Sequence, residues 1–217
     1  MMDLMALTPA LLKQMSLEDL PLLAEDIRRF IIDITSKQGG HVGSSLGVIE
    51  LAIALHFVCD SPSIPILWDT GHNAYAHRIL TGRAAQFKTL NTFGGMSRFL
   101  DRSDSPYDVL SASHAGTAIS TAVGLAHAMR VAGDEHRVVA VVGDGTLGEG
   151  LTWEGLNYLA GTDLPIMIVL NDNGYSIPKT VGGIATLLTP RSAHGNEDTG
   201  SFFRALGLRY YGPFFGH

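Results

Sequence analysis

The spacing of hydrophobic residues changes along the chain, and each spacing predicts a different element. Between residues 16 and 38, apolar side chains recur three and four positions apart, which predicts an amphipathic helix that ends at Gly39-Gly40. Residues 45–58 are almost wholly apolar, so we expect a helix that is buried on most sides. Residues 1–15 show no regular period and are interpreted as a loose N-terminal arm.

Two continuous runs of β-branched residues predict strands that are covered on both faces. They span residues 137–142 and 165–170, and a predicted helix at 150–161 separates them. A strand, a helix and a second strand in this order form a βαβ unit, whose strands are parallel and whose crossover is right-handed. The further predictions are a strand at 64–68, helices at 72–80 and 117–131, a polar, glycine-rich mobile loop at 182–200 and a short final strand at 208–211.

Together these elements predict a three-layer α/β fold with a mostly parallel sheet, and residues 16–217 are interpreted as one domain. The 217-residue chain carries a formal net charge of −6, which argues against nucleic-acid binding because phosphate contacts need clustered Lys and Arg. The sequence contains no apolar run of the ~20 residues that a membrane span needs and no signal-peptide pattern, so we expect a cytoplasmic protein. The single cysteine, Cys59, excludes an internal disulfide.

The segment after the first β-branched strand carries the most informative motif. Gly143, Gly145 and Gly148 match the G-x-G-x-x-G fingerprint of dinucleotide-binding folds. Asp172 lies 29 residues after Gly143 and would then serve as the ribose-binding acid, although the usual interval is ~20 residues. Asp144 argues against this hypothesis, because its carboxylate would face a pyrophosphate unless a cation lay between them.

A divalent cation accounts for the same segment better. Asp144 follows one strand of the βαβ unit and Asn173 follows the other, 29 residues later, so both side chains are expected at the carboxyl edge of the sheet. A carboxylate, an amide oxygen and a backbone carbonyl offer hard oxygen ligands, and the remaining positions suit diphosphate oxygens and water around Mg²⁺ or Ca²⁺. The N-terminus of the following helix would face the same anion.

Three histidines share a sequence context. His41, His72 and His114 each lie in a loop of small residues just ahead of a predicted helix. An imidazole can move protons on sugar hydroxyls near neutral pH and can donate a hydrogen bond to a diphosphate. We therefore interpret these three residues as candidates for catalysis.

The motif Gly143-Asp144-Gly145 followed by Asn173 resembles the thiamine-diphosphate-binding motif. Residues 20–217 as a whole resemble the N-terminal, diphosphate-binding half of the 1-deoxy-D-xylulose-5-phosphate synthase family and, more distantly, transketolase. The stretches that match in the same order are 39–47, 68–82, 113–117, 143–173 and 205–213. This resemblance implies the thiamine-diphosphate-binding fold.

The resemblance also implies roles for particular residues. It places His41 near the reacting carbon of the cofactor and His72 at the diphosphate or the substrate. Asp144, Asn173 and the carbonyl of Tyr175 would hold Mg²⁺ or Ca²⁺. The implied catalytic residues are His41, His72 and His114, and the implied cofactor-binding residues are His72, Ser113, His114, Ala115, Gly143, Asp144, Gly145, Thr146 and Asn173.

The implied activity is transfer of a two-carbon ketol or acyl unit from a ketose phosphate or a 2-keto acid to an acceptor, either a sugar phosphate or a carrier-protein thiol. The family's pyrimidine-binding half, with its activating glutamate, has no counterpart in the 217 residues. We therefore hypothesise a separate pyrimidine-domain subunit in an α2β2 heterotetramer, with an acyl carrier protein as a possible further partner. Two alternatives stay open: an NAD(P)-binding oxidoreductase domain, and a non-catalytic homologue that only binds cofactor or a regulatory partner.

Overall fold

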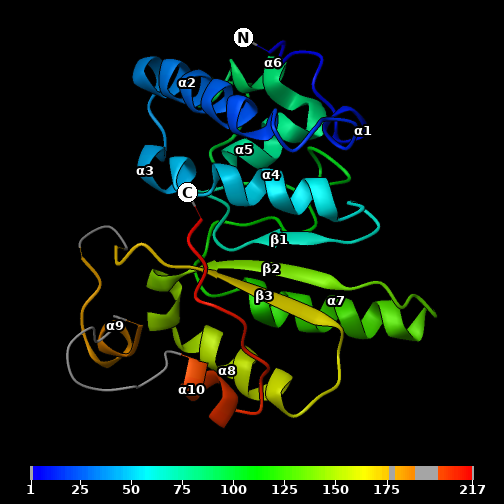
Figure 1. The fold of residues 1–217 in the computed structure, drawn as a ribbon, viewed down its shortest axis with the longest axis vertical. Helices are drawn as coiled ribbons and strands as arrows, with labels where there is room; N and C mark the ends of the chain where they lie inside the picture. Colours follow the sequence, from blue (N-terminus) through cyan, green and yellow to red (C-terminus); the bar gives the residue numbers. More distant parts are fainter. Residues whose placement is uncertain (1, 176–178, 189–199, 217) are drawn as a thin grey trace. The chain divides into compact units, whose positions relative to one another are not determined.

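The computed structural model describes residues 2–175, 179–188 and 200–216. They form two compact units, one ending at Ser113 and the other beginning at His114 (Figure 1). That residues 16–217 act as one diphosphate-binding domain stays a prediction. Within the described ranges, no helix combines the length and the apolar character that crossing a lipid bilayer requires.

The N-terminal unit is built around helices whose apolar faces meet. Helix α2 (Leu20–Gln38) buries the stripe that its sequence predicts, and α4 (Ile49–Val58) is apolar on nearly every side. These two helices pack against each other, and both contact α5 (Tyr75–Arg78). The other elements of this unit are α1 (Pro9–Leu12), α3 (Val42–Leu46), β1 (Ile66–Trp68), the π-helical segment η1 (Ile79–Arg83) and α6 (Ala84–Phe87).

Two sequence expectations for this unit differ from the structure. Residues 1–15 are not a loose arm throughout, because they contain α1 and bury Leu4, Leu7 and Leu12. A four-residue helix is too short to show a period in the sequence, which is why the pattern missed it. The single helix predicted at 45–58 is divided into α3 and α4, and the break falls at Gly47, a poor helix former.

The C-terminal unit contains the predicted βαβ arrangement. Strands β2 (Val138–Gly143) and β3 (Ile166–Asn171) pair in parallel, with Val138 opposite Ile166 and Gly143 opposite Asn171. Helix α8 (Gly150–Ala160) connects them, and α7 (Ala118–Val131) packs against both strands and against α8 (Figure 1). The parallel pairing confirms the prediction, although β3 is half-buried where we expected a strand covered on both faces.

A glycine lets α7 and α8 approach each other closely. A Cβ atom on Gly155 of α8 would lie 2.9 Å from side-chain atoms of both Ile119 and Ser120 of α7. Any larger residue at this position would therefore push the two helices apart. This close contact supports the strands whose ends carry the candidate site.

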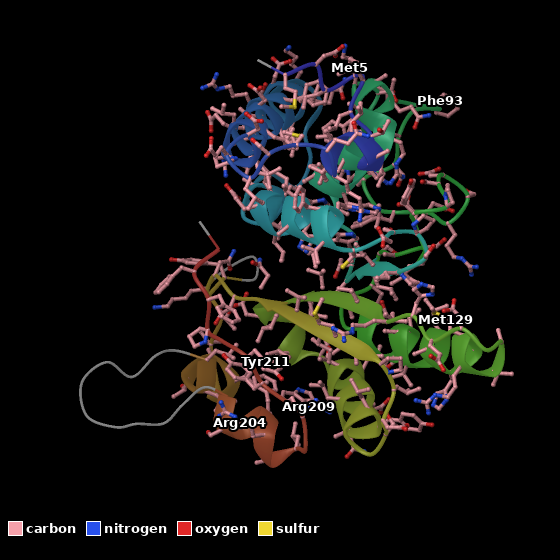
Figure 2. All side chains as sticks on the ribbon, turned by 45° about the vertical axis from the view of Figure 1, so that its right-hand side comes forward. Met5, Phe93, Met129, Arg204, Arg209 and Tyr211 are labelled. Atoms are coloured by element: carbon pink, nitrogen blue, oxygen red, sulfur yellow. The ribbon has the colours of Figure 1, made fainter. Side chains whose placement is uncertain are left out.

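The segment after β3 also differs from its prediction. Part of the loop expected at 182–200 is helical, as α9 (Gly183–Leu188) and the start of α10 (Gly200–Ala205), while residues 189–199 lie outside the described ranges. Residues 208–211 do not form the predicted strand. Instead the ring of Tyr210 stacks on Phe203 at a centroid distance of 5.8 Å. Figure 2 labels Arg204, Arg209 and Tyr211 in and after α10.

Candidate functional site

The carboxyl ends of β2 and β3 bring acidic residues to one edge of the sheet. Gly143 lies opposite Asn171 in the strand register, so Asp144 and Asp172 follow at the same edge. Asp144 begins the 3₁₀ helix η2 (Asp144–Gly148) and is only 3% exposed. Its Oδ2 atom accepts a hydrogen bond of 2.7 Å from the hydroxyl of Thr180. Within the described ranges, no lysine or arginine forms an ion pair with this carboxylate.

The negative charge at this edge affects the pKa of the Asp172 carboxyl. Burial raises its pKa above the ordinary value, the N–H of Gly174 opposes the rise, and the charge of Asp144 adds to it. Neighbouring carboxylates repel each other, and a divalent cation between them would replace that repulsion with attraction. This edge therefore fits a metal ion with oxygen ligands.

Asn173 lies in a tight turn directly after β3. Its Oδ1 atom accepts the backbone N–H of Tyr175 at 2.9 Å. An amide oxygen has two lone pairs, so Asn173 can hold this turn and still bind a cation. No group of three His, Cys, Asp or Glu residues in the described part of the chain could hold a metal, so an ion here would need amide and carbonyl oxygens. Ligation by Asp144, Asn173 and the carbonyl of Tyr175 stays a prediction.

The residues around Asp144 use their side chains to fix the η2 turn. The hydroxyl of Thr146 donates to the carbonyl of Gly143 at 2.7 Å, and the hydroxyl of Thr152 donates to the carbonyl of Thr146 at the same distance. Thr146 is 6% exposed. The turn is therefore rigid, and the role of Gly143, Gly145 and Thr146 in holding a diphosphate stays a prediction.

Two of the candidate histidines meet in the N-terminal unit. The rings of His41 and His72 make an edge-to-face contact with centroids 5.6 Å apart, and Phe99 lies 5.5 Å from His41. Burial and the charge of Arg98 lower the pKa of His41. Burial, followed by the charge of His41, lowers the pKa of His72 against an opposing effect of Asp69. Both imidazoles are therefore neutral at pH 7.

The same two histidines each keep one buried nitrogen without a hydrogen-bond partner. Nδ1 of His41 and Nδ1 of His72 form no hydrogen bond in the part of the chain that the structure describes. A hydrogen bond fixes the backbone of His72, because the hydroxyl of Ser45 donates to its carbonyl at 3.0 Å. Buried polar atoms without partners are rare in proteins, so these nitrogens are available to a ligand.

The third candidate histidine lies at the start of the C-terminal unit. His114 is exposed, and its Nδ1 atom is 2.8 Å from the carbonyl oxygen of Ala115, so Nδ1 is the donor and Nε2 the acceptor. Gly116 has a φ of +82°, and a Cβ on it would lie 2.8 Å from Glu149, so only glycine fits there. Cofactor binding by Ser113, His114 and Ala115 stays a prediction.

Comparison with known sequences places these features in a family. Residues 5–199 match the family described as 1-deoxy-D-xylulose-5-phosphate synthase. The chain belongs to the 1-deoxy-D-xylulose-5-phosphate synthase family. This confirms the resemblance that the five ordered sequence stretches indicated, and the match corresponds to the N-terminal part of the family.

Several members of the 1-deoxy-D-xylulose-5-phosphate synthase family are similar to this chain over nearly its whole length. The synthase of Chlorobaculum tepidum is 40% identical over 247 residues, covering 97% of this chain and 39% of the relative. That of Myxococcus xanthus is 46% identical over 210 residues, covering 97% and 35%. The chain thus spans between about a third and two fifths of the length of these two relatives.

A solved structure supports the fold. Transketolase from Leishmania mexicana superimposes with a TM-score of 0.68 at 21% identity, covering 87% of this chain and 31% of that chain. Together with the parallel β2–β3 pair and its flanking helices, this confirms the predicted three-layer α/β fold class. At this level of identity the likeness concerns the fold alone.

The structure of the segment after β2 agrees less well with a dinucleotide-binding site than with a cation site. A dinucleotide fingerprint leads from a strand through a tight turn directly into a helix whose N-terminus binds the pyrophosphate. Here the five-residue 3₁₀ helix η2 lies between β2 and α8. Asp144, the first residue of η2, is the buried carboxylate that such a site would have to exclude.

Sequence patterns missed a fully buried polar network in this family member. Nε2 of His56 lies 2.9 Å from Nδ1 of His77, and Nε2 of His77 lies 2.8 Å from Asp108. Arg83 donates to both oxygens of Asp108, at 2.5 and 2.8 Å. Both His77 and Arg83 are buried. Thr180 at Asp144 was missed as well, since no sequence motif marks it.

Proposed function

We propose that this chain binds thiamine diphosphate through a divalent cation, as the diphosphate-binding part of an enzyme that transfers ketol or acyl units. The observation that carries the proposal is Asp144, a buried carboxylate at the edge of a parallel strand pair without a basic partner among the described residues. Asp172 adds negative charge at the same edge. Membership of the 1-deoxy-D-xylulose-5-phosphate synthase family supports this proposal.

The residues that would hold the cofactor divide into two groups. Asp144, Asn173 and the carbonyl of Tyr175 would bind Mg²⁺ or Ca²⁺, hard cations that prefer oxygen ligands and also bind diphosphate oxygens. The residues that would contact the cofactor are Ser113, His114, Ala115, Gly143, Gly145 and Thr146. When bound, thiamine diphosphate supplies the carbon centre at which the substrate carbonyl reacts.

The histidines would handle the protons of the reaction. Because burial lowers the pKa of His41 and of His72, each presents a neutral imidazole at pH 7. A neutral ring can accept a proton from a substrate hydroxyl at its unprotonated nitrogen and return it in a later step. His114 is the third candidate, with Nε2 free to accept because Nδ1 donates to Ala115.

Resemblance to the family supports a substrate class for this proposal. The donor would be a ketose phosphate or a 2-keto acid, and the acceptor a sugar phosphate or a carrier-protein thiol. The curated relatives are more than twice as long as this chain, so the rest of the active site would come from a pyrimidine-binding region. A separate subunit in a heterotetramer, an acyl carrier protein as partner and a cytoplasmic location stay predictions.

Calorimetric titration with thiamine diphosphate tests the proposal. We expect saturable binding in the presence of Mg²⁺ and no measurable binding when the ion is chelated. Asp144→Asn keeps the shape of the side chain and removes its charge, so its affinity should fall by at least ~100-fold, about 2.7 kcal/mol. Asp163→Asn, which changes an exposed aspartate paired with Arg130, is the matched control and should bind as the wild type does.

Three outcomes discriminate between the hypotheses. Unchanged affinity in Asp144→Asn would contradict a cation held by this carboxylate. Binding of NAD(P) without metal would favour the oxidoreductase hypothesis instead. Normal cofactor binding with no turnover after the pyrimidine-binding region is added would favour a non-catalytic homologue.

A further inference from the structure

The turn that carries His41 has few hydrogen bonds of its own. It connects α2 to α3 through Gly39 and Gly40, whose φ angles are +74° and +147°. Glycine adopts such angles without steric cost, and it is also the most flexible residue. A histidine that takes part in proton transfer needs a fixed position, so contacts from outside the turn must supply the rigidity.

Tyr75, the first residue of α5, contacts the last residues of this turn. Its hydroxyl oxygen accepts the backbone N–H of His41 at 3.1 Å. A Cβ on Gly40 would lie 2.8 Å from the same oxygen, so the turn and the phenol are in close contact. The ring is fully buried and packs edge-to-face on Phe87 at a centroid distance of 5.1 Å. The hydroxyl is therefore held in place by the core of the N-terminal unit.

Asn91 holds the first residues of the turn. Its side-chain Nδ2 donates to the carbonyl of Gln38 at 3.1 Å and to that of Gly39 at 3.0 Å. The backbone of Asn91 has a φ of +62°, in the left-handed region that asparagine tolerates better than most residues. Phe93, in the turn that begins at Asn91, is fully exposed (Figure 2), so hydrophobic burial of Phe93 does not fix this turn.

Arg98 orients the amide of Asn91. Its Nε donates to Oδ1 of Asn91 at 2.9 Å, which leaves Nδ2 to face the two carbonyls. Arg78, almost fully buried, donates in turn to the carbonyls of Ser97 and Phe99 on either side of Arg98. The hydrogen bonds thus run from the buried core through the 97–99 segment to the turn before His41.

We propose that Tyr75 and Asn91 are positioning residues: Tyr75 holds the backbone N–H of His41, Asn91 holds the carbonyls of Gln38 and Gly39 just before it, and together they fix the imidazole of His41 for proton transfer. The proposal rests on the proposed function, because it gives His41 a reaction to serve. Neither residue contacts the reacting atoms in this account. Their effect passes through the backbone from Gln38 to His41.

Three substitutions test the proposal without large changes in packing. Tyr75→Phe removes only the hydroxyl. Asn91→Gly keeps the left-handed backbone and removes the amide, while Asn91→Asp keeps an acceptor for Arg98 but cannot donate to the carbonyls. The matched controls are Tyr158→Phe, which removes an exposed hydroxyl 3.1 Å from Nε2 of His127, and Asn157→Asp on the exposed face of α8.

The first readout is amide hydrogen exchange of His41 by NMR on the chain without cofactor. Tyr75→Phe should speed exchange of this amide by at least ~10-fold, because its only acceptor among the described residues is gone. The second readout is turnover of the enzyme assembled with its pyrimidine-binding region. All three variants should lower kcat by ~10- to 100-fold and leave KM within about twofold, and the two Asn91 variants should agree.

The results separate this proposal from the proposed function. Unchanged exchange in Tyr75→Phe, or kcat values equal to those of the controls, would overturn the positioning role. A fall in kcat that only follows a fall in melting temperature would do the same, because it would indicate a merely structural role. A wild-type chain that does not bind thiamine diphosphate would instead contradict the proposed function and leave the exchange result standing.

Discussion

Two pairs of neighbouring histidines lie in the N-terminal unit, and their surroundings differ. His56 and His77 stack with ring centroids 5.0 Å apart and are almost completely buried. His41 and His72 meet edge-to-face at 5.6 Å and are only half-buried. Burial lowers the pKa in all four rings. A lowered pKa alone therefore does not distinguish a functional histidine from a structural one.

Hydrogen bonding does distinguish the two pairs. A carboxylate only accepts, so Nε2 of His77 donates to Asp108, and its Nδ1 must then accept from Nε2 of His56. Only Nδ1 of His56 has no partner in the described part of the chain. In the other pair, both Nδ1 atoms lack one. The sealed pair, His56 and His77, uses three of its four ring nitrogens in hydrogen bonds within the fold, whereas the open pair, His41 and His72, leaves both Nδ1 atoms for a ligand.

The buried network of His56, His77, Asp108 and Arg83 is called the sealed network below. Breaking it should have the largest effect on stability. Asp108→Asn removes the charge that pairs with Arg83, which is 6% exposed, and should lower the free energy of unfolding by about 3–5 kcal/mol. Urea denaturation measures this loss. Asp163→Asn removes an aspartate that pairs with Arg130 on the surface and should leave the denaturation midpoint unchanged. Equal effects of the two changes would contradict a structural role for the network.

We expect a smaller decrease in the free energy of unfolding when the pH falls. Burial, and then the charge of His77, lowers the pKa of His56 well below 6.5, so the unfolded chain binds a proton at a pH where the folded chain does not. Stability should therefore decrease as the pH falls below about 6.5, by at most about 1.4 kcal/mol per pH unit for each such histidine. Urea denaturation at pH 8, 6 and 5 checks this slope. His56→Gln should flatten it, and a protein that gained stability between pH 6.5 and 5 would contradict it.

Asp108 has its own, lower pH window. Burial opposes its ionisation, but hydrogen bonds from His77 and Arg83 outweigh this and lower its pKa from 3.8 to about 2. Its contribution to stability is present above the unfolded pKa and is lost as the pH falls from about 4 towards 2. Acid thus destabilises the fold in two steps: protonation of the buried histidines comes first, and protonation of Asp108 follows at lower pH.

The sequence predicted those parts of the molecule that depend on local pattern. The β-branched runs marked β2 and β3, and the spacing of a strand–helix–strand unit placed Asp144 and the start of the Asn173 turn at one sheet edge. Nothing local marks the sealed network, because the bonded residues are 21 to 31 positions apart. The hydroxyl of Tyr75 likewise meets His41 across 34 residues, and only the packed fold brings them together.

The comparison of the two histidine pairs is tested most directly by histidine NMR during a titration with thiamine diphosphate and Mg²⁺. If His41 and His72 contact the bound cofactor, their ring resonances shift as the protein becomes saturated with it, while those of His56 and His77 stay unchanged. Shifts confined to His56 and His77, or no shift in any of the four under saturating cofactor, would contradict this account.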